Sequence, residues 1–365
     1  MSSLMWKDIM KTTELKGIEK VISDGNHLLE LAREWLKQGN TAVAFQLLNQ
    51  ALKSKETECN KTLKGELSKE VGRVYTQTGQ WDRAEDAYTQ AKSIFLETGN
   101  YRGAAESVRN LANMKFQLGE FSLSETLCET AIGWATKSGD FQLRATILNT
   151  QGAIKSIEGK QKESIHVFRL CLSDFRRSGN KMRQAYVLHN IGLVQMEMSQ
   201  YQDARTSFEE ALALALESRD LNLVELCYQN MAKMHLQVGD LIAARSLIKS
   251  ARELLDTLKS PAAEVDLDIT DADCRRRFGD LKNSENILER ALNMAREHSL
   301  SQHEAEILYL GGLVAADGGE THIARSRLEA AMALFKKTGG GGIKKAVEKL
   351  RALDESANDR ASRKQ

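Results

Sequence analysis

The six residues FQLGEF (116–121) decide the fold, because the glycine at their centre returns at a fixed interval along the chain. Forty residues earlier the chain reads TQTGQW (76–81), and forty residues later it reads SIEGKQ (156–161). Seven of the eight positions in this register are glycine, and the eight are Gly39, Gly79, Gly119, Gly159, Ser199, Gly239, Gly279 and Gly319. Glycine makes up only about 7% of an average protein, so the column indicates an internal repeat of forty residues.

Other columns of the repeat keep their residue size from one unit to the next. Small residues stand seven positions before the turn and five and twelve positions after it, as in Gly152, Ser164 and Cys171 of the fourth repeat. A mainly large column, with Phe168 in the same repeat, stands nine positions after the turn. Small residues let two helix backbones approach closely, so these columns predict helix crossings with a large side chain between neighbours.

A second helix-ending signal lies halfway between the turns, at Gly99-Asn100, Gly139-Asp140 and Gly179-Asn180. Glycine ends a helix in the left-handed conformation, and Asn or Asp caps the next helix. Ser260-Pro261 serves at another junction, with proline at the first helical position. Each repeat is therefore predicted to be helix, tight turn, helix and loop. One such hairpin buries its apolar face only by stacking on the next.

The combined pattern resembles the tetratricopeptide repeat (TPR). The stretches VRNLANMKFQLGEF (108–121) and LHNIGLVQMEMSQY (188–201) are similar to the long-repeat TPRs of Pins-type adaptors, kinesin light chains and bacterial peptide-sensing regulators. The chain departs from the common pattern in its period, which is forty rather than about 34 residues, and in lacking the proline near the end of the second helix. The resemblance implies an all-α, right-handed α-solenoid of about eight hairpins with terminal capping helices.

This resemblance sets the expected domain boundaries. We expect an N-terminal capping helix over 1–24, eight TPR-like repeats over 25–338, a glycine linker with a C-terminal capping helix over 339–354, and a disordered polar tail over 355–365. Apolar residues at helical spacing predict both caps, because the open ends of a stack must be covered. The tail, ESANDRASRKQ, is polar, as is typical of disordered segments.

Composition and charge exclude several classes of protein. The chain has 51 Lys and Arg against 50 Asp and Glu, so it carries no electrostatic footprint for DNA or RNA. No apolar run reaches the roughly 18 residues that span a membrane, and the N-terminus lacks the apolar region of a signal peptide. We therefore predict a cytoplasmic protein. Its five cysteines form no CxxC motif, and the repeat register predicts that Cys59 is exposed and the other four are buried.

The sequence also lacks the constellations that catalysis requires. The seven histidines are scattered, and His298 and His303 have no matching Cys or carboxylate pattern for zinc. No phosphate-binding loop of the GxxxxGK[ST] kind and no GxSxG elbow is present. We therefore expect a protein that is not an enzyme and that uses no cofactor and no metal.

The resemblance implies that the first helix of each repeat lines a concave groove, with the columns ten, nine and six residues before the turn facing the ligand. The candidate partner-binding residues are Lys69, Arg73, Arg109, Asn110, Asn113, Asn149, His189, Asn190, Gln229, Asn230 and Lys233. Asn suits the backbone of an extended peptide, and Lys or Arg would hold its carboxylates. The alternative is a solvated polar face. Asn recurs in one column, which favours binding.

The seventh repeat is unusual, because EVDLDITDADCRRR (264–277) places Asp268 and Asp271 in columns that are largely apolar elsewhere. Asp271–Arg275 and Asp273–Arg277 have the spacing of helical ion pairs. One interpretation is a helix shifted toward the surface, with solvated pairs. The other is a softened joint, or an acidic end of the groove that orients a charged partner.

These observations favour a non-catalytic scaffold or adaptor that binds a peptide or a helical segment of a partner protein in its groove. The alternatives are a peptide-sensing regulator that controls an effector, and a non-catalytic subunit of a larger complex. The repeats start near residue 25, which leaves room for one helix before them and counts against an N-terminal DNA-binding domain. The expected partner is a protein or peptide, and the pattern leaves the oligomeric state open.

Overall fold

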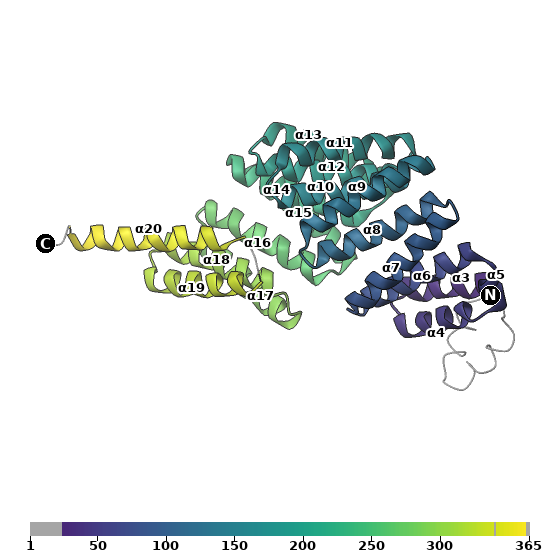
Figure 1. Cartoon of the computed structure of the whole chain (residues 1–365). Helices are drawn as coiled ribbons and strands as arrows, with labels where there is room; N and C mark the ends of the chain where they lie inside the picture. Colours follow the sequence, from purple (N-terminus) through teal and green to yellow (C-terminus); the bar gives the residue numbers. More distant parts are fainter. Residues whose placement is uncertain (1–23, 339–340, 363–365) are drawn as a thin grey trace. The chain divides into compact units, whose positions relative to one another are not determined.

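The structure is a computed structural model that describes residues 24–338 and 341–362 (Figure 1). The predicted all-α fold is confirmed, because this part of the chain forms 18 helices, α3–α20, and no strand. The capping helix expected over residues 1–24 lies outside the described residues, except for Asp24, the N-cap of α3. The chain divides into two compact units, described separately below as the N-terminal unit (α3–α11) and the C-terminal unit (α12–α20).

The N-terminal unit consists of four helical hairpins and one short helix, α5, which follows the first hairpin. Its helices are α3 (Gly25–Lys37), α4 (Thr41–Leu52), α5 (Lys55–Cys59), α6 (Lys61–Gln77), α7 (Trp81–Glu97), α8 (Tyr101–Gln117), α9 (Phe121–Ser138), α10 (Phe141–Ile157) and α11 (Gln161–Arg177). The first helices of the hairpins are α3, α6, α8 and α10, and each packs against the second helix that follows the turn.

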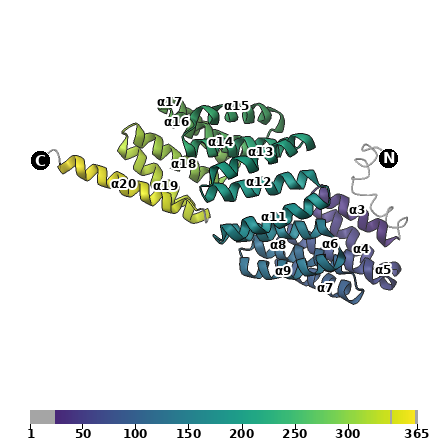
Figure 2. The ribbon, with the colours of Figure 1, turned by 90° about the horizontal axis from the view of Figure 1, so that it is seen from above.

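The C-terminal unit repeats the same hairpin four times and ends on a single helix. Its helices are α12 (Lys181–Glu197), α13 (Tyr201–Ser218), α14 (Leu221–Val238), α15 (Leu241–Leu258), α16 (Pro261–Arg277), α17 (Leu281–Glu297), α18 (Ser301–Asp317), α19 (Thr321–Thr338) and α20 (Ile343–Ser362). Helix α20 packs against α19 (Figure 2). Because α20 continues to Ser362, the prediction of a disordered tail is wrong for residues 355–362. Residues 363–365 lie outside the described part.

A left-handed backbone residue ends the helices every twenty residues from Gly79 to Gly319, so the backbone period is half the period of the sequence. Four of these positions are not glycine: Ser199 (φ 59°), Arg219 (55°), Lys259 (48°) and Ser299 (55°). The left-handed conformation costs a non-glycine residue roughly 1–2 kcal/mol. The helix-ending geometry is therefore kept even where the sequence signal for it is missing.

The small and large columns predicted from the sequence contact each other in the structure. The small residue lies on the first helix of a hairpin and the large side chain on the second. A Cβ atom added to Gly152 would lie 2.7 Å from the ring of Phe168. The same distance separates a Cβ on Gly192 from Phe208, and the contacts at Gly72 and Gly312 are equally close. Since real Cβ contacts are longer than this, the large side chain, which is aromatic in three of these hairpins and Leu328 in the fourth, requires glycine on the facing helix.

Serine replaces alanine five residues after the turn without leaving a polar group unsatisfied. Ser124, Ser164 and Ser284 are fully buried. Each hydroxyl donates a hydrogen bond of 2.7–2.8 Å to the carbonyl oxygen of the small residue seven positions before the turn. The buried column therefore accepts either residue, because the hydroxyl finds its partner across the hairpin.

The cysteine prediction is confirmed, since Cys59 is exposed and the other four cysteines are buried. Among the described residues, no helix is long and apolar enough to cross a membrane.

Candidate functional site

The first helices of consecutive hairpins contact one another within each unit, whereas second helices of consecutive hairpins show no comparable contact in the described part. The first helices therefore form one continuous surface in each unit. We call these surfaces the N-terminal face (α3, α6, α8 and α10) and the C-terminal face (α12, α14, α16 and α18). Six of the predicted binding residues, Lys69 to Asn149, lie in the N-terminal unit and five, His189 to Lys233, lie in the C-terminal unit.

A ladder of ion pairs runs along the N-terminal face from one first helix to the next. The Arg33 guanidinium lies 2.5 Å from Glu66 and 3.1 Å from Glu70 of the following first helix. The Lys69 ammonium lies 3.0 Å from Glu66 and also pairs with Glu106 on α8. The charges of α3, α6 and α8 therefore neutralise one another across the hairpins.

The ladder includes Lys69 and Arg73, two cations that we predicted to hold a carboxylate of a ligand. Lys69 is only 5% exposed and pairs with two glutamates, and Arg73 lies 2.7 Å from Glu70. Burial acts to raise the pKa of Glu106, but the charges of Lys69, Arg102 and Arg109 outweigh it and lower the pKa. A depression of about 440 Å³ over the ladder is lined by Arg33, Glu66, Lys69, Asn100, Arg102, Gly103 and Glu106.

The predicted amides of the N-terminal face are engaged within the protein. The Arg109 guanidinium donates to the Asn110 side-chain oxygen over 3.0 Å. The Asn113 oxygen accepts a 3.1 Å hydrogen bond from the Thr150 hydroxyl on α10, so this amide joins two hairpins. Asn149 is half-buried on the same helix. These contacts give Asn110 and Asn113 a structural role on this face.

On the C-terminal face, two predicted residues from different hairpins meet. The Asn230 side-chain amide on α14 lies 3.0 Å from Nε2 of His189 on α12, and it also donates to the Leu226 carbonyl over 3.0 Å. His189 is 6% exposed. Burial lowers the pKa of His189 to about 4, against the opposing effect of its hydrogen bond with half-buried Asn190. His189 is therefore neutral near pH 7, and its Nε2 accepts the amide proton.

Two buried polar side chains on α14 are only partly satisfied by the protein. Glu225 is 2% exposed and Gln229, one helical turn later, is 1% exposed. No described residue hydrogen-bonds the Glu225 Oε1 atom or the Gln229 Nε2 atom. Sequence reasoning found Gln229 but missed Glu225. The signal was present, because the same column elsewhere contains only Gly25, Gly65, Ala105, Ala145, Ala185, Val265 and Ala305.

The surroundings of Glu225 are acidic. Burial raises its pKa to about 7, and the negative charge of Asp266 on α16 adds to the shift, while Lys233 opposes it. Burial and the Asp266 charge also raise the pKa of Glu306 on α18. Lys233 lies 3.1 Å from Asp266 and neutralises it, so this cation has no free charge for a ligand carboxylate. The C-terminal face is thus suited to a ligand that brings hydrogen-bond donors or a positive charge.

The aspartates of the seventh repeat are placed differently from a solvated helix and from an acidic end of the groove. The ion pairs Asp271–Arg275 (3.1 Å) and Asp273–Arg277 (2.9 Å) are present as predicted. Asp268, however, is fully buried, and its partners are arginines of the second helices α15 and α17. It is therefore neither a solvated surface residue nor an acidic end of the first-helix surface.

The described residues contain no group of three or more His, Cys, Asp or Glu placed to hold a metal ion. Burial raises the pKa of the Cys128 and Cys227 thiols to about 12, so neither forms a thiolate near pH 7. What the two faces present to a ligand is hydrogen-bonding groups and charge.

Family models described as "Tetratricopeptide repeat" match residues 69–94 and 183–257. No curated protein sequence matches this one closely enough to count as a relative. Among solved structures, the apo form of the quorum sensor NprR from B. thuringiensis is 14% identical, with a TM-score of 0.67 over 88% of this chain and 91% of that one.

Two further structures share the fold. Aspartyl phosphate phosphatase F from Bacillus subtilis is 14% identical, with a TM-score of 0.62 over 79% of this chain and 75% of that one. The Rap conjugation gene regulator of the plasmid pLS20, in complex with the Phr* peptide, is 15% identical, with a TM-score of 0.56 over 86% and 95%. At these identities the likeness concerns the fold alone. The chain therefore contains tetratricopeptide repeats and shares the helical-hairpin fold of these Rap and NprR proteins.

Proposed function

We propose that the chain is a non-catalytic binding protein whose C-terminal face holds a peptide segment of a partner protein. The observation that carries the proposal is the pair Glu225 and Gln229, which are buried on one side of α14 and keep an acceptor and a donor unsatisfied. An unsatisfied buried polar group costs about 1–3 kcal/mol, and a bound peptide would supply the missing partners.

The chemistry of this face defines the class of segment. Gln229 offers an amide donor to a peptide carbonyl, while Glu225 and Glu306 favour a positive charge. The proposed segment is therefore an extended peptide with at least one Lys or Arg. Asn190, Asn230 and Lys233 border the same helices and would orient its backbone. On the N-terminal face, by contrast, the predicted residues are proposed to stabilise the stack.

The fold comparisons support a binding role in general terms. The pLS20 regulator was solved with the Phr* peptide, and another structure of the same fold is a Rap protein complexed with Competence and Sporulation Factor, at 13% identity and a TM-score of 0.58. The phosphatase activity in the name of aspartyl phosphate phosphatase F is a statement about that protein and is not transferred to this chain. For this chain we propose recognition without catalysis.

The test selects a phage-displayed library of random twelve-residue peptides against the full chain. Individual peptides are then labelled with fluorescein and measured by anisotropy. We expect peptides enriched in Lys and Arg, whose affinity falls at least tenfold in Gln229→Ala/Asn230→Ala, about the value of one hydrogen bond. Glu225→Gln keeps the shape of the side chain and removes its charge, so it tests the preference for basic peptides.

The matched control is Arg109→Ala/Asn110→Ala, which changes the same two columns on the N-terminal face. It should leave peptide affinity within about twofold, and circular dichroism should show that both variants keep their helices. Peptides that bind the wild type and both variants equally, or a selection that yields no peptide, would refute the proposal.

The alternative role is a peptide-sensing regulator, favoured by the peptide named in the pLS20 complex. The two roles differ in how far the effect of binding extends. In an adaptor, amide hydrogen exchange slows only on the helices of the C-terminal face. In a sensor, the same peptide also changes exchange in the N-terminal unit, because the signal must reach a separate effector surface.

A further inference from the structure

The joint formed by α15, α16 and α17 is built from charged residues where most other repeats are apolar. Arg252 stands thirteen positions after its turn, where one other repeat has Lys92 and six have Leu52, Ile132, Leu172, Leu212, Leu292 and Met332. Asp268 stands eleven positions before its turn, where five repeats have Leu28, Val108, Leu148, Leu188 and Leu308. At these two positions, apolar contacts between consecutive hairpins are thus replaced by ionic contacts.

These ionic contacts include a buried carboxylate. Asp268 is fully buried, 2.6 Å from the Arg252 guanidinium on α15 and 2.7 Å from that of Arg290 on α17. Asp271 lies 3.1 Å from Arg275 on the same helix and 3.7 Å from Arg252. Each aspartate of the joint is therefore held by two arginines, and its charge is compensated within the protein.

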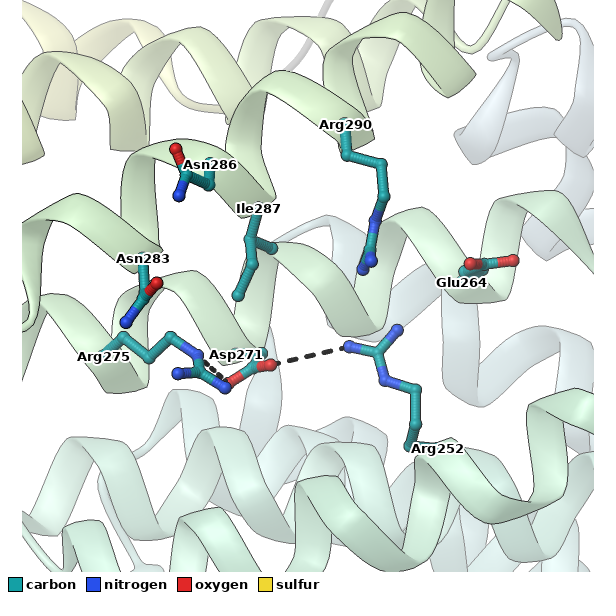
Figure 3. Close-up of a pocket in the computed structure, with 8 residues that line it drawn as sticks. All are labelled: Arg252, Glu264, Asp271, Arg275, Asn283, Asn286, Ile287 and Arg290. Atoms are coloured by element: carbon teal, nitrogen blue, oxygen red, sulfur yellow. Dashed lines mark hydrogen bonds and ion pairs between the residues drawn. The ribbon is translucent and has the colours of Figure 1, made fainter.

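A cleft opens over these pairs. Figure 3 shows Arg252, Asp271, Arg275 and Arg290 converging on it from α15, α16 and α17; its volume is about 420 Å³. A second hollow of about 730 Å³ shares Arg252, Asp271 and Arg275 with the first and extends along α15. The two hollows form one depression on the second-helix side of the C-terminal unit, which we call the outer cleft.

The outer cleft carries a surplus of positive charge. Arg245 and Lys249 line it one helical turn apart on α15, and both are exposed. Neither forms an ion pair with any carboxylate of the described residues, while Asp268 and Asp271 are already held by arginines. The larger hollow is thus lined by more cations than carboxylates, with Arg245, Lys249, Arg252 and Arg275 against Glu253 and Asp271, while Glu264 lines the smaller hollow.

Apolar side chains lie next to these cations. Ile242 on α15 is 80% exposed, in a column that elsewhere contains Ala42, Asp82, Ser122, Lys162, Gln202, Lys282 or His322. Phe278, at the end of α16, is 47% exposed and lines the same hollow. An exposed isoleucine at a position that is otherwise polar or small, beside unpaired cations, is the composition of a docking surface rather than of a solvated helix.

We infer that the outer cleft is a second docking site, for an acidic segment of a partner protein that carries an aliphatic or aromatic side chain. The acidic residues pair with Arg245 and Lys249, and the apolar side chain packs against Ile242 and Phe278. The phosphates of a nucleic acid could also pair with Arg245 and Lys249. A nucleic acid backbone would not pack against the exposed Ile242, however, so the geometry favours a protein segment. The outer cleft lies apart from the C-terminal face and binds the opposite charge.

The experiment separates peptides that depend on the outer cleft from all others. The random twelve-residue library is selected on the wild-type chain and counter-selected on Arg245→Glu/Lys249→Glu. The surviving peptides should be rich in Asp and Glu and contain a Leu, Ile, Phe or Trp. Their affinity should fall at least tenfold in the double variant and about threefold in Ile242→Ser, and added salt should weaken it.

The matched control is Lys162→Glu/Arg169→Glu on α11, an equal charge reversal of two exposed residues on another second helix. It should leave these peptides bound as in the wild type, and so should Asn230→Ala/Lys233→Ala, which alters only the C-terminal face. Three results would overturn the inference: no peptide survives the counter-selection, the survivors are not acidic, or a twelve-nucleotide single-stranded DNA binds as tightly and with the same dependence on Arg245 and Lys249.

Discussion

The two first-helix faces use the same repeat columns but differ in whether the protein satisfies its own polar groups. On the N-terminal face, Lys69 is paired with Glu66 and Glu106 across neighbouring helices. On the C-terminal face, Glu225 and Gln229 are equally buried but keep unsatisfied atoms. A polar residue in a ligand-facing column is therefore no sufficient sign of a binding site. What matters is whether the neighbouring repeat supplies its partner.

The difference follows from one column. Thirteen residues before the turn, the N-terminal face has Glu66 and Glu106, which meet the cations of the adjacent helix. The middle repeats have Thr146, Tyr186 and Leu226 at this position. Charge compensation through this column is thus interrupted after α8 and resumes only at Asp266 on α16, which pairs with Lys233, so the faces acquire different chemistry although their backbones repeat. Four predictions test this contrast, from the largest expected effect to the smallest.

The largest effect is expected for Lys69→Ala. It leaves Glu66 and Glu106 without their shared, buried cation, so the free energy of unfolding should fall by about 3–5 kcal/mol. The matched change on the other face, Lys233→Ala, removes a pair whose two side chains are about one-third exposed, and should cost less than about 1 kcal/mol. Urea unfolding measures both, and equal losses would contradict the contrast between the faces.

Glu225→Ala should stabilise the protein. Burial raises the pKa of this carboxyl from 4.5 to about 7, so keeping it ionised at pH 8 costs about 3 kcal/mol by linkage. Alanine occupies the same column in neighbouring repeats, so the backbone accepts it. Urea unfolding at pH 8 should show a gain of about 2–3 kcal/mol that disappears near pH 4. Glu106→Ala, whose carboxyl has a lowered pKa, should instead destabilise; a loss in both variants would refute the distinction.

The pH dependence of stability should reveal two opposing groups. The folded state lowers the pKa of His189 from 6.5 to about 4, so it binds fewer protons there than the unfolded chain and stability rises with pH. It raises the pKa of Glu225 from 4.5 to about 7, so stability falls with pH. The two contributions cancel between about pH 4.5 and 6.5.

Removing either group should expose the other. In Glu225→Gln, stability relative to the wild type should rise by about 1.4 kcal/mol per pH unit near the middle of that window. In His189→Gln it should fall by about the same amount. Urea midpoints measured from pH 4 to 8 provide the check, and profiles parallel to that of the wild type would show that neither side chain is buried as described.

The smallest effect is expected for Asn230→Ala, which removes one hydrogen bond to His189. Stability should fall by about 1 kcal/mol, the usual net value of a neutral hydrogen bond. Asn113→Ala is the counterpart on the N-terminal face and loses the bond to Thr150. The contrast lies in function: only Asn230→Ala should also weaken the binding of selected peptides. A weakening by Asn113→Ala would place binding on both faces.

The sequence by itself determined the hairpin fold. The turn glycines and the small columns depend on local backbone geometry and on contacts within one hairpin, such as Gly152 with Phe168, and these repeat with the sequence. The buried cysteines followed for the same reason. The left-handed helix ends at residues other than glycine, such as Arg219, could not be predicted because no glycine marks them in the sequence.

Only the tertiary structure decided which polar groups are satisfied. Lys69 and Gln229 stand in the same column, yet one is paired across the stack and the other is not. The burial of Asp268 between Arg252 and Arg290 joins three helices and has no counterpart in the pattern of any single repeat. Hydrogen bonds and ion pairs depend on atoms within about 3 Å that come from neighbouring hairpins, and a repeat read alone does not contain them.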